Sequence, residues 1–105
     1  MEFTVKAFSK DEIRRFATYK RNSNGFKVMH QQIQSIFPAL NSRKDFILSW
    51  KDEDGDKVNF SSDEELCSAM NYILLQPDSK HLMRVYVKVP EAYKLLTLTL
   101  SATSA

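Results

Sequence analysis

The stretch Trp50–Leu66, WKDEDGDKVNFSSDEEL, carries two local folding signals in one short run. Its DEDGD segment is a turn sequence, in which Gly55 can adopt the positive φ that a tight turn demands. The flanking segments KDFILSW and KVNF have the composition of strands, so we expect them to form a β-hairpin. Ser62, followed by Glu65 three residues later, forms a capping box, which predicts that a helix begins directly after this hairpin.

Alternation of apolar and polar residues predicts three further strands. The segment EFTVKAF places Phe3, Val5 and Ala7 on one face, with the two-residue period of a strand. The segment DEIRRFATYK is rich in β-branched and aromatic residues and follows a polar break at residues 9–10, so it predicts a second hairpin. The segment LMRVYVKV, residues 82–89, alternates in the same way and predicts the last strand.

Two segments have helical spacing instead. The first runs from an N-cap at Ser23 or Asn24 to Pro38, and the second follows the capping box. Their apolar stripes consist of Phe26, Met29, Ile33, Ile36 and Phe37 in the first helix, and Leu66, Ala69, Met70, Ile73 and Leu74 in the second. The predicted order is therefore ββαββαβ, an α+β fold. A mixed sheet with two helices in this order is typical of the ubiquitin-like β-grasp.

Length and composition indicate one folded domain. The chain has 105 residues, 43% of them hydrophobic, and a single cysteine, Cys67, which we expect to be a small core residue in a reducing compartment. We assign residues 1–89 to the domain and residues 90–105 to a tail. The tail alternates leucine with threonine, which fits either an added strand or a disordered end. No apolar run approaches the roughly 20 residues that span a bilayer, so we expect no membrane partner and a cytoplasmic protein, with the nucleus or cytoplasmic bodies as further locations.

Charge is distributed very unevenly along the chain. Residues 1–51 carry ten Lys or Arg against four Asp or Glu, residues 52–66 carry one against seven, and residues 67–105 carry four against two. These balances of +6, −6 and +2 add up to the net charge of +2. Opposite charges segregated in this way usually concern partners rather than the fold, and they make a self-complementary molecule conceivable.

The acidic block could suggest a calcium-binding EF-hand loop, because that loop also begins D-x-D-x-D. Counted from Asp52, however, the sixth position is Lys57 where the loop needs glycine, and the eighth is Asn59. The twelfth position is Asp63 instead of the longer, bidentate glutamate. We therefore predict no metal site, and nothing else in the sequence indicates a cofactor.

Catalysis and nucleic-acid binding also fit the sequence poorly. His30 and His81 have no paired nucleophile, no glycine-rich phosphate loop and no zinc-ligand spacing beside them, so we predict that the chain is not an enzyme. The basic N-terminal half contains interleaved aromatic residues, but the acidic block opposes binding to phosphates and no RNP-type motif is present. We therefore expect no nucleic-acid partner.

Part of the acidic block has a structural explanation. Residues 63–65 complement the positive end of the second helix dipole. Asp52, Glu53, Asp54 and Asp56 are then left repelling one another on one short turn. A cationic partner that neutralises them would explain why they are grouped.

Five segments of the chain resemble, in order, the PB1 domain, the Phox-and-Bem interaction module, of the kind found in a selective-autophagy receptor. They are FTVKAF, EIRRF, IFPAL, KDEDGDKVNFSSDEEL and AMNYI, and the resemblance extends over roughly residues 3–88. The resemblance implies a β-grasp fold, which agrees with the predicted element order. It also implies a front-to-back contact, in which the basic cluster of one domain binds the acidic motif of the next.

Matched by motif position, the resemblance assigns residues to both sides of such a contact. The basic side consists of Lys6 on the first strand and Arg14 and Arg15 on the second. The acidic side consists of Asp52, Asp54 and Asp56, extended onto the second helix by Asp63 and Glu64, with Glu65 as a further candidate. A chain with both sides would polymerise with itself, as in the oligomerisation of autophagy receptors and signalling scaffolds, and would bind other PB1-domain proteins. The alternative is a monomeric ubiquitin-like module that binds a different protein.

The two neighbouring arginines raise a geometric question. In a regular strand Arg14 and Arg15 point to opposite faces. Either an edge position or a bulge brings both to the partner, or only one of them is essential, in which case we expect Arg14.

Overall fold

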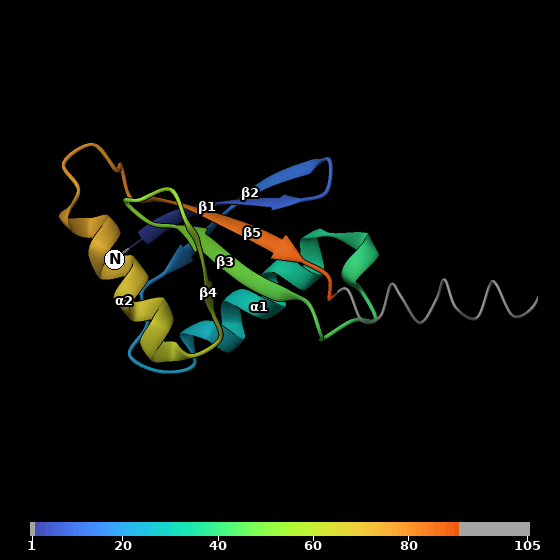
Figure 1. Cartoon of the computed structure of the whole chain (residues 1–105). Helices are drawn as coiled ribbons and strands as arrows, with labels where there is room; N and C mark the ends of the chain where they lie inside the picture. Colours follow the sequence, from blue (N-terminus) through green and yellow to red (C-terminus); the bar gives the residue numbers. More distant parts are fainter. Residues whose placement is uncertain (1, 91–105) are drawn as a thin grey trace, which may run out of the picture.

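The computed structural model describes residues 2–90, so the predictions about the tail concern residues that lie almost wholly outside the described part. The predicted order ββαββαβ is confirmed, with one short 3-10 helix added after the first α-helix (Figure 1). The elements are β1 Glu2–Ser9, β2 Glu12–Tyr19, α1 Gly25–Ile36, η1 Pro38–Leu40, β3 Ile47–Lys51, β4 Lys57–Phe60, α2 Asp63–Leu75 and β5 Leu82–Lys88.

The five strands form one mixed sheet in the order β2-β1-β5-β3-β4. The first and last strands, β1 and β5, pair in parallel in the middle of the sheet. The other pairs are antiparallel: β2 with β1, β3 with β5, and β4 with β3. Because β2 and β4 form the two edges, each predicted hairpin contributes one edge strand. The chain therefore has the mixed sheet that the sequence predicts.

Both helices cover the same face of this sheet (Figure 1). The alternation in β1 places Phe3, Val5 and Ala7 on that face, each with 0% of its surface exposed, and Met83 and Val85 of β5 lie beside them. The helices contribute the other half of the core from their apolar stripes. Its buried members are Met29 and Ile33 from α1 and Leu66, Ala69, Met70 and Ile73 from α2. We call the opposite side of the sheet the open face, because no helix of the described residues covers it.

One boundary and the burial of one residue differ from the expectations. The strand predicted from Lys44 begins only at Ile47, because Phe46 turns into the core and stacks on His30, with ring centroids 4.0 Å apart. Cys67 is half-buried, at the margin of the core rather than inside it. No helix among the described residues is long and apolar enough to cross a membrane.

The predicted cap of α2 is present, with a small shift. The Ser62 Oγ accepts a hydrogen bond from the Glu65 N–H at 3.1 Å. The Glu65 carboxylate accepts in return from the N–H of Ser61 at 3.0 Å, one residue earlier than in the standard capping box. The start of α2 is therefore held from both sides, directly after β4.

The predicted N-cap position of α1 is confirmed at Asn24, but the side-chain hydrogen bond expected of an N-cap residue is absent. Asn24 occupies the N-cap position, but its backbone is left-handed, with φ of 59°, and its side chain makes no capping bond. The carboxylate of Asp63, the first residue of α2, accepts instead from the N–H of Asn24 and from the N–H of Phe26, both at 2.9 Å. One side chain thus satisfies N–H groups at the start of α1 while occupying the first turn of α2, where its charge is also favoured.

This double role predicts that Asp63 stabilises the fold more than its neighbour does. Replacing it in Asp63→Ala removes two hydrogen bonds and a favourable helix-end charge, so the free energy of unfolding should fall by about 1–2 kcal/mol. Urea denaturation followed by circular dichroism would measure this. Glu64→Ala is the matched control, because the Glu64 side chain makes no hydrogen bond or ion pair within residues 2–90 and its loss should change stability by less than about 0.5 kcal/mol. Equal effects of the two variants would contradict the assignment.

Candidate functional site

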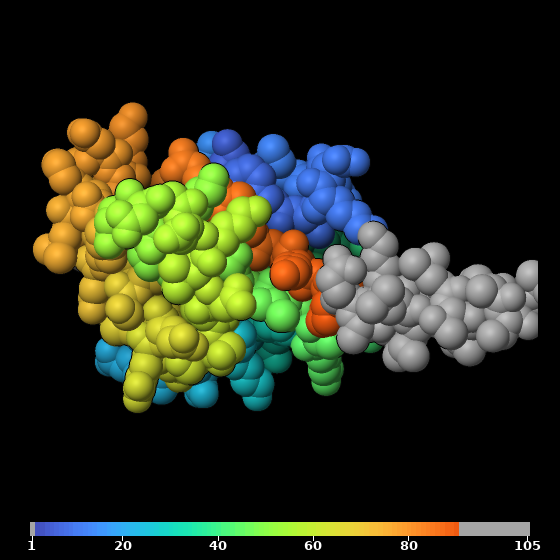
Figure 2. All heavy atoms as spheres, viewed as in Figure 1, coloured from blue at the N-terminus to red at the C-terminus, as the bar shows by residue number. Residues whose placement is uncertain are grey.

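The acidic loop, residues 52–56, is a tight turn between β3 and β4. The N–H of Asp52 donates to the carbonyl of Asp56 at 3.0 Å, and the N–H of Gly55 donates to the carbonyl of Asp52, also at 3.0 Å. Gly55 has a φ of 80°, as the sequence predicts for this position. The hairpin thus holds the loop at one end of the sheet, and Figure 2 shows the loop on the viewed surface of the molecule.

Asp52 differs from the other carboxylates of the loop. It is half-buried, and its Oδ1 accepts from the N–H of Asp54 at 3.0 Å and from the N–H of Asp56 at 3.1 Å. The side chains of Asp54 and Asp56 are exposed and accept no hydrogen bond among the described residues. Asp52 therefore shapes the loop, and Asp54 and Asp56 present their charges to solvent.

The loop concentrates negative charge in a small volume. Carboxylate oxygens of Asp52, Asp54 and Asp56 lie within 4.8 Å of one another. The two ion pairs found in residues 2–90 join Arg14 to Glu12 and Arg43 to Asp45, so neither neutralises the loop. Such unpaired charges create a local negative potential that would attract a cationic partner.

Two side chains beside the loop differ in whether its charge affects them. Tyr72 of α2 is half-buried, and burial raises the pKa of its hydroxyl, while the negative charge of Glu53 raises that pKa further. Lys57 follows the loop directly, but its Nζ lies 4.5 Å from the ring centroid of Tyr86 on the open face. The one lysine of the acidic block is thus held by an aromatic ring and not by the carboxylates beside it in sequence.

Three clustered carboxylates could hold a metal ion, so the calcium alternative needs a structural answer. The residue at the twelfth position of an EF-hand loop would be Asp63, which is engaged by backbone N–H groups of α1. The sixth position, Lys57, packs on Tyr86. Neither residue is placed as an EF-hand loop requires at its position. The absence of a metal site stays a prediction.

Asp63 and Glu64 differ in the same way as the residues of the loop, because one is hydrogen-bonded within the chain and the other is not. Both are exposed and lie in the first turn of α2, but only Asp63 is used inside the chain. Glu65 is engaged by Ser61 and Ser62. Of the acidic residues predicted on this helix, Glu64 is therefore the one that is free of hydrogen bonds and ion pairs within residues 2–90.

The predicted basic residues lie on the hairpin β1–β2, where the register divides them. Lys6 is opposite Arg15 and shares the open face with it, whereas Arg14 is opposite the buried Ala7 and points toward the helix side. Arg14 also pairs with Glu12, its Nη2 lying 3.0 Å from the carboxylate. The pairing from residues 2–9 to residues 12–19 is continuous, so no bulge brings the two arginines together, although β2 is the expected edge strand.

A further cation that the sequence did not single out lies beside Lys6. The parallel register places Arg84 of β5 opposite Lys6, and Tyr86 opposite Phe8. The rings of Phe8 and Tyr86 stack with centroids 4.8 Å apart and an interplanar angle of 11°, which shows that both side chains project from the open face. The alternation in β5 predicts that Arg84 points outward, but only the sheet order reveals that it neighbours Lys6.

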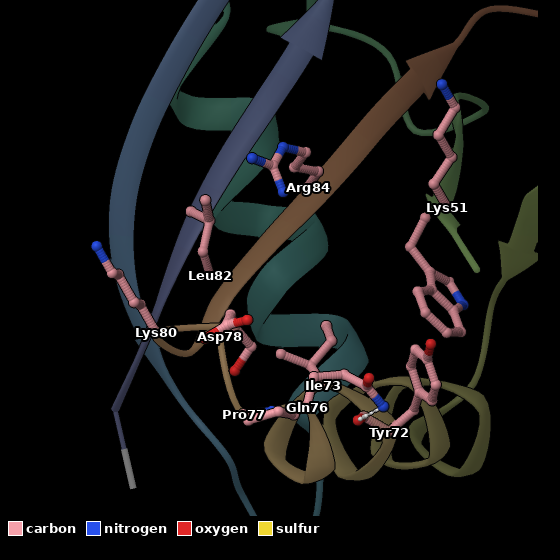
Figure 3. A pocket seen from close by; sticks show the side chains of 11 residues that line it. Lys51, Tyr72, Ile73, Gln76, Pro77, Asp78, Lys80, Leu82 and Arg84 are labelled. Carbon is pink, nitrogen blue, oxygen red and sulfur yellow. Dashed lines mark hydrogen bonds between the residues drawn. The ribbon is translucent and has the colours of Figure 1, made fainter. Parts of the chain in front are cut away.

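A groove of about 670 Å³ lies between the start of β5, the end of β3 and the end of α2 (Figure 3). One wall carries Trp50 and Tyr72, whose ring centroids are 5.5 Å apart. Arg84 and Lys80 line the side nearer β5. The groove therefore combines an aromatic wall with cationic side chains.

Comparison with known proteins gives a consistent result. The family model described as "PB1 domain" matches residues 2–90. Two solved structures are similar to this chain: the AtNBR1-PB1 domain has a TM-score of 0.64 at 19% sequence identity, with 85% of this chain and 98% of that chain covered. The AtNBR1-PB1 filament (L-type), solved by cryo-electron microscopy, has a TM-score of 0.65 at 22% identity, with 86% and 99% covered. At these identities the two structures show a shared fold.

The hydrogen bonds of Asp52 predict a measurable effect on the loop. In Asp52→Ala the N–H groups of Asp54 and Asp56 lose their acceptor, and we expect their amide hydrogen exchange to accelerate about fivefold, the effect of roughly 1 kcal/mol each. Asp52→Asn keeps an oxygen at the same position and should stay within about twofold of the natural chain. Exchange measured by nuclear magnetic resonance would decide, and an unchanged rate in the alanine variant would show that the turn is held by its backbone alone.

Proposed function

The chain belongs to the PB1 domain family of protein-interaction modules, and on this premise we propose that it assembles with itself head to tail. The single observation that carries the proposal is the presence of two surfaces of opposite charge on one chain. The acidic loop has no ion pair within the described residues, and neither have Lys6 and Arg15 on the open face. Each surface is thus available to the opposite surface of another copy.

The residues divide into those that contact the partner and those that hold them in place. We propose that Lys6 and Arg15 form the basic half of the contact, and that Arg14 joins it only if its guanidinium leaves Glu12. Geometry therefore favours Arg15, the reverse of the preference expected from the sequence.

On the acidic half we propose Asp54, Asp56 and Glu64 as the carboxylates that meet the partner. Asp52 and Asp63 belong to the same half, but each already accepts two backbone hydrogen bonds. Their proposed contribution is to position the loop and the start of α2. Their negative charges still add to the local potential that the partner meets.

A structure with the same fold supports assembly as an outcome for this architecture, because AtNBR1-PB1 has been solved as a filament. We extend the proposal to other PB1-domain proteins as partners, and to a cytoplasmic scaffold role of the kind that selective-autophagy receptors perform. Neither a nucleic acid nor a membrane is part of it. The competing possibility is a monomeric ubiquitin-like module that binds an unrelated protein.

Blocking either surface should stop growth without unfolding the chain. Lys6→Glu with Arg15→Glu gives a basic-reversed variant, and Asp54→Arg with Asp56→Arg gives an acidic-reversed variant. Each should be a folded monomer, because exposed charge changes alter stability by only about 0.5 kcal/mol while like charges across a contact cost several. Mixed at tens of micromolar, the two should form a dimer that grows no further.

Light scattering of the separate and mixed variants measures this outcome. The dimer ends growth because the basic-reversed copy contributes its acidic half and the acidic-reversed copy its basic half, which leaves no intact surface. A mixture that stays monomeric, or single variants that still polymerise, would rule out the head-to-tail contact and favour the monomeric alternative.

Salt provides a second test of the same contact. Raising the ionic strength from about 0.05 M to about 0.5 M shortens the Debye length to about 4 Å, so exposed charge pairs are screened and the oligomers should become smaller. Sedimentation velocity at each salt concentration would follow the change. Association driven by apolar surface would be unaffected or strengthened, so oligomers that persist at high salt would contradict an electrostatic contact.

A further inference from the structure

We propose that Arg84 extends the basic half of the contact onto a third strand and binds a carboxylate of the acidic half of a second copy of this chain. This inference rests on the proposed head-to-tail assembly and specifies its basic surface. It adds a residue from the far end of the sequence to a surface that the motif assigns to the first hairpin alone.

The sheet register places three cations in one row. Arg15 of β2 is opposite Lys6 of β1, and Lys6 is opposite Arg84 of β5, so the three side chains project from the open face of three successive strands. The stacked rings of Phe8 and Tyr86, one step further along β1 and β5, confirm which face these positions occupy. With strands about 4.8 Å apart, the row measures about 10 Å from Arg15 to Arg84.

The open face as a whole lacks the negative charge needed to balance this row. Six cations project from it, and Glu2 is the single carboxylate that shares it among the residues of the five strands. The cations are Lys6, Arg15, Lys51, Lys57, Arg84 and Lys88. Like charges this close repel one another, and an anionic partner relieves the repulsion.

Arg84, like Arg15 in the same row, is suited to bind a carboxylate directly. Its side chain is exposed and lines the groove, and it has neither a hydrogen bond nor an ion pair within residues 2–90 (Figure 3). A guanidinium offers several N–H donors in a fixed plane and can bind a carboxylate through two of them. Lys6, the lysine of the row, already lies over the ring of Phe8, with its Nζ 5.7 Å from the ring centroid. Outside the row, Lys51 and Lys57 lie over the ring of Tyr86.

The acidic half of a second copy offers a carboxylate for each of the three cations. Its clustered oxygens from Asp52, Asp54 and Asp56 lie within 4.8 Å, about the spacing of two neighbouring strands. The exposed carboxylates of Glu53 and Glu64 extend the acidic half beyond this cluster. Two cations on neighbouring strands would pair with the cluster alone. The third cation, at the other end of the row, would pair with a carboxylate outside the cluster.

The complementing pair of variants isolates this contact for measurement. The acidic-reversed variant contributes the intact basic half, and Arg84→Gln is added to it, while the basic-reversed variant contributes the acidic half. We expect isothermal titration calorimetry at low salt to show an increase in Kd of about tenfold, the loss of one charge-assisted contact. Arg84→Lys should weaken binding less, because it keeps the charge but loses the planar fork.

Lys88→Gln is the matched control. Lys88 lies on the same strand and the same face, four residues and about 13 Å along β5, and its removal changes the net charge equally. We expect its Kd to change by less than twofold, with the melting temperature of all variants unchanged. Equal effects of Arg84→Gln and Lys88→Gln would overturn the role of Arg84 and leave head-to-tail assembly intact. Failure of the pair with Arg84 present would overturn both.

Discussion

The parallel pairing of β1 with β5 is the constraint on which the rest of the structure depends. It joins the first and last elements of the described chain in the middle of the sheet, so each hairpin is attached to the other only through this contact and the helices. Because paired residues share a face, the same register buries Ala7 beside Val85 and exposes Lys6 beside Arg84. Core and basic surface are two consequences of one alignment. A shift of one residue would bury the cations and expose the core.

The acidic residues follow a division of labour that net charge alone conceals. Asp52 organises its loop through two backbone N–H groups, and Asp63 joins the beginnings of the two helices in the same way. Asp54, Asp56 and Glu64 are left without such bonds among the described residues. A carboxylate already bonded to N–H groups has less to gain from a cationic partner than an unbonded one, since part of its acceptor capacity is used. Substitutions at the two kinds of position therefore have different meanings.

Local patterns in the sequence predict the elements well and their contacts poorly. The two-residue period places Phe3 and Val5 in the core, and the capping box locates the start of α2, because both depend on residues close in sequence. The cap of α1 comes from Asp63, 37 residues after Phe26, and no local pattern announces it. The face of Arg15 depends on β2 having no bulge, and the neighbourhood of Arg84 depends on the sheet order. Both are properties of long-range pairing, on which residue types near each position carry little information.

The charges also explain why a rigid scaffold suits a head-to-tail contact. Exposed ion pairs contribute little individually, about 0–1 kcal/mol, partly because holding two mobile side chains together costs entropy. Several pairs formed at once gain more when their partners are already in position. In this chain the acidic loop is held by Asp52, and the basic row stands on adjacent strands of one sheet. A contact between two different, preorganised surfaces leaves one of each free on every complex. Growth then continues until the rotation between copies closes a ring or a partner with only one of the surfaces binds the end. In the proposed head-to-tail assembly, the ratio of such one-sided partners to this chain would set the length of each assembly.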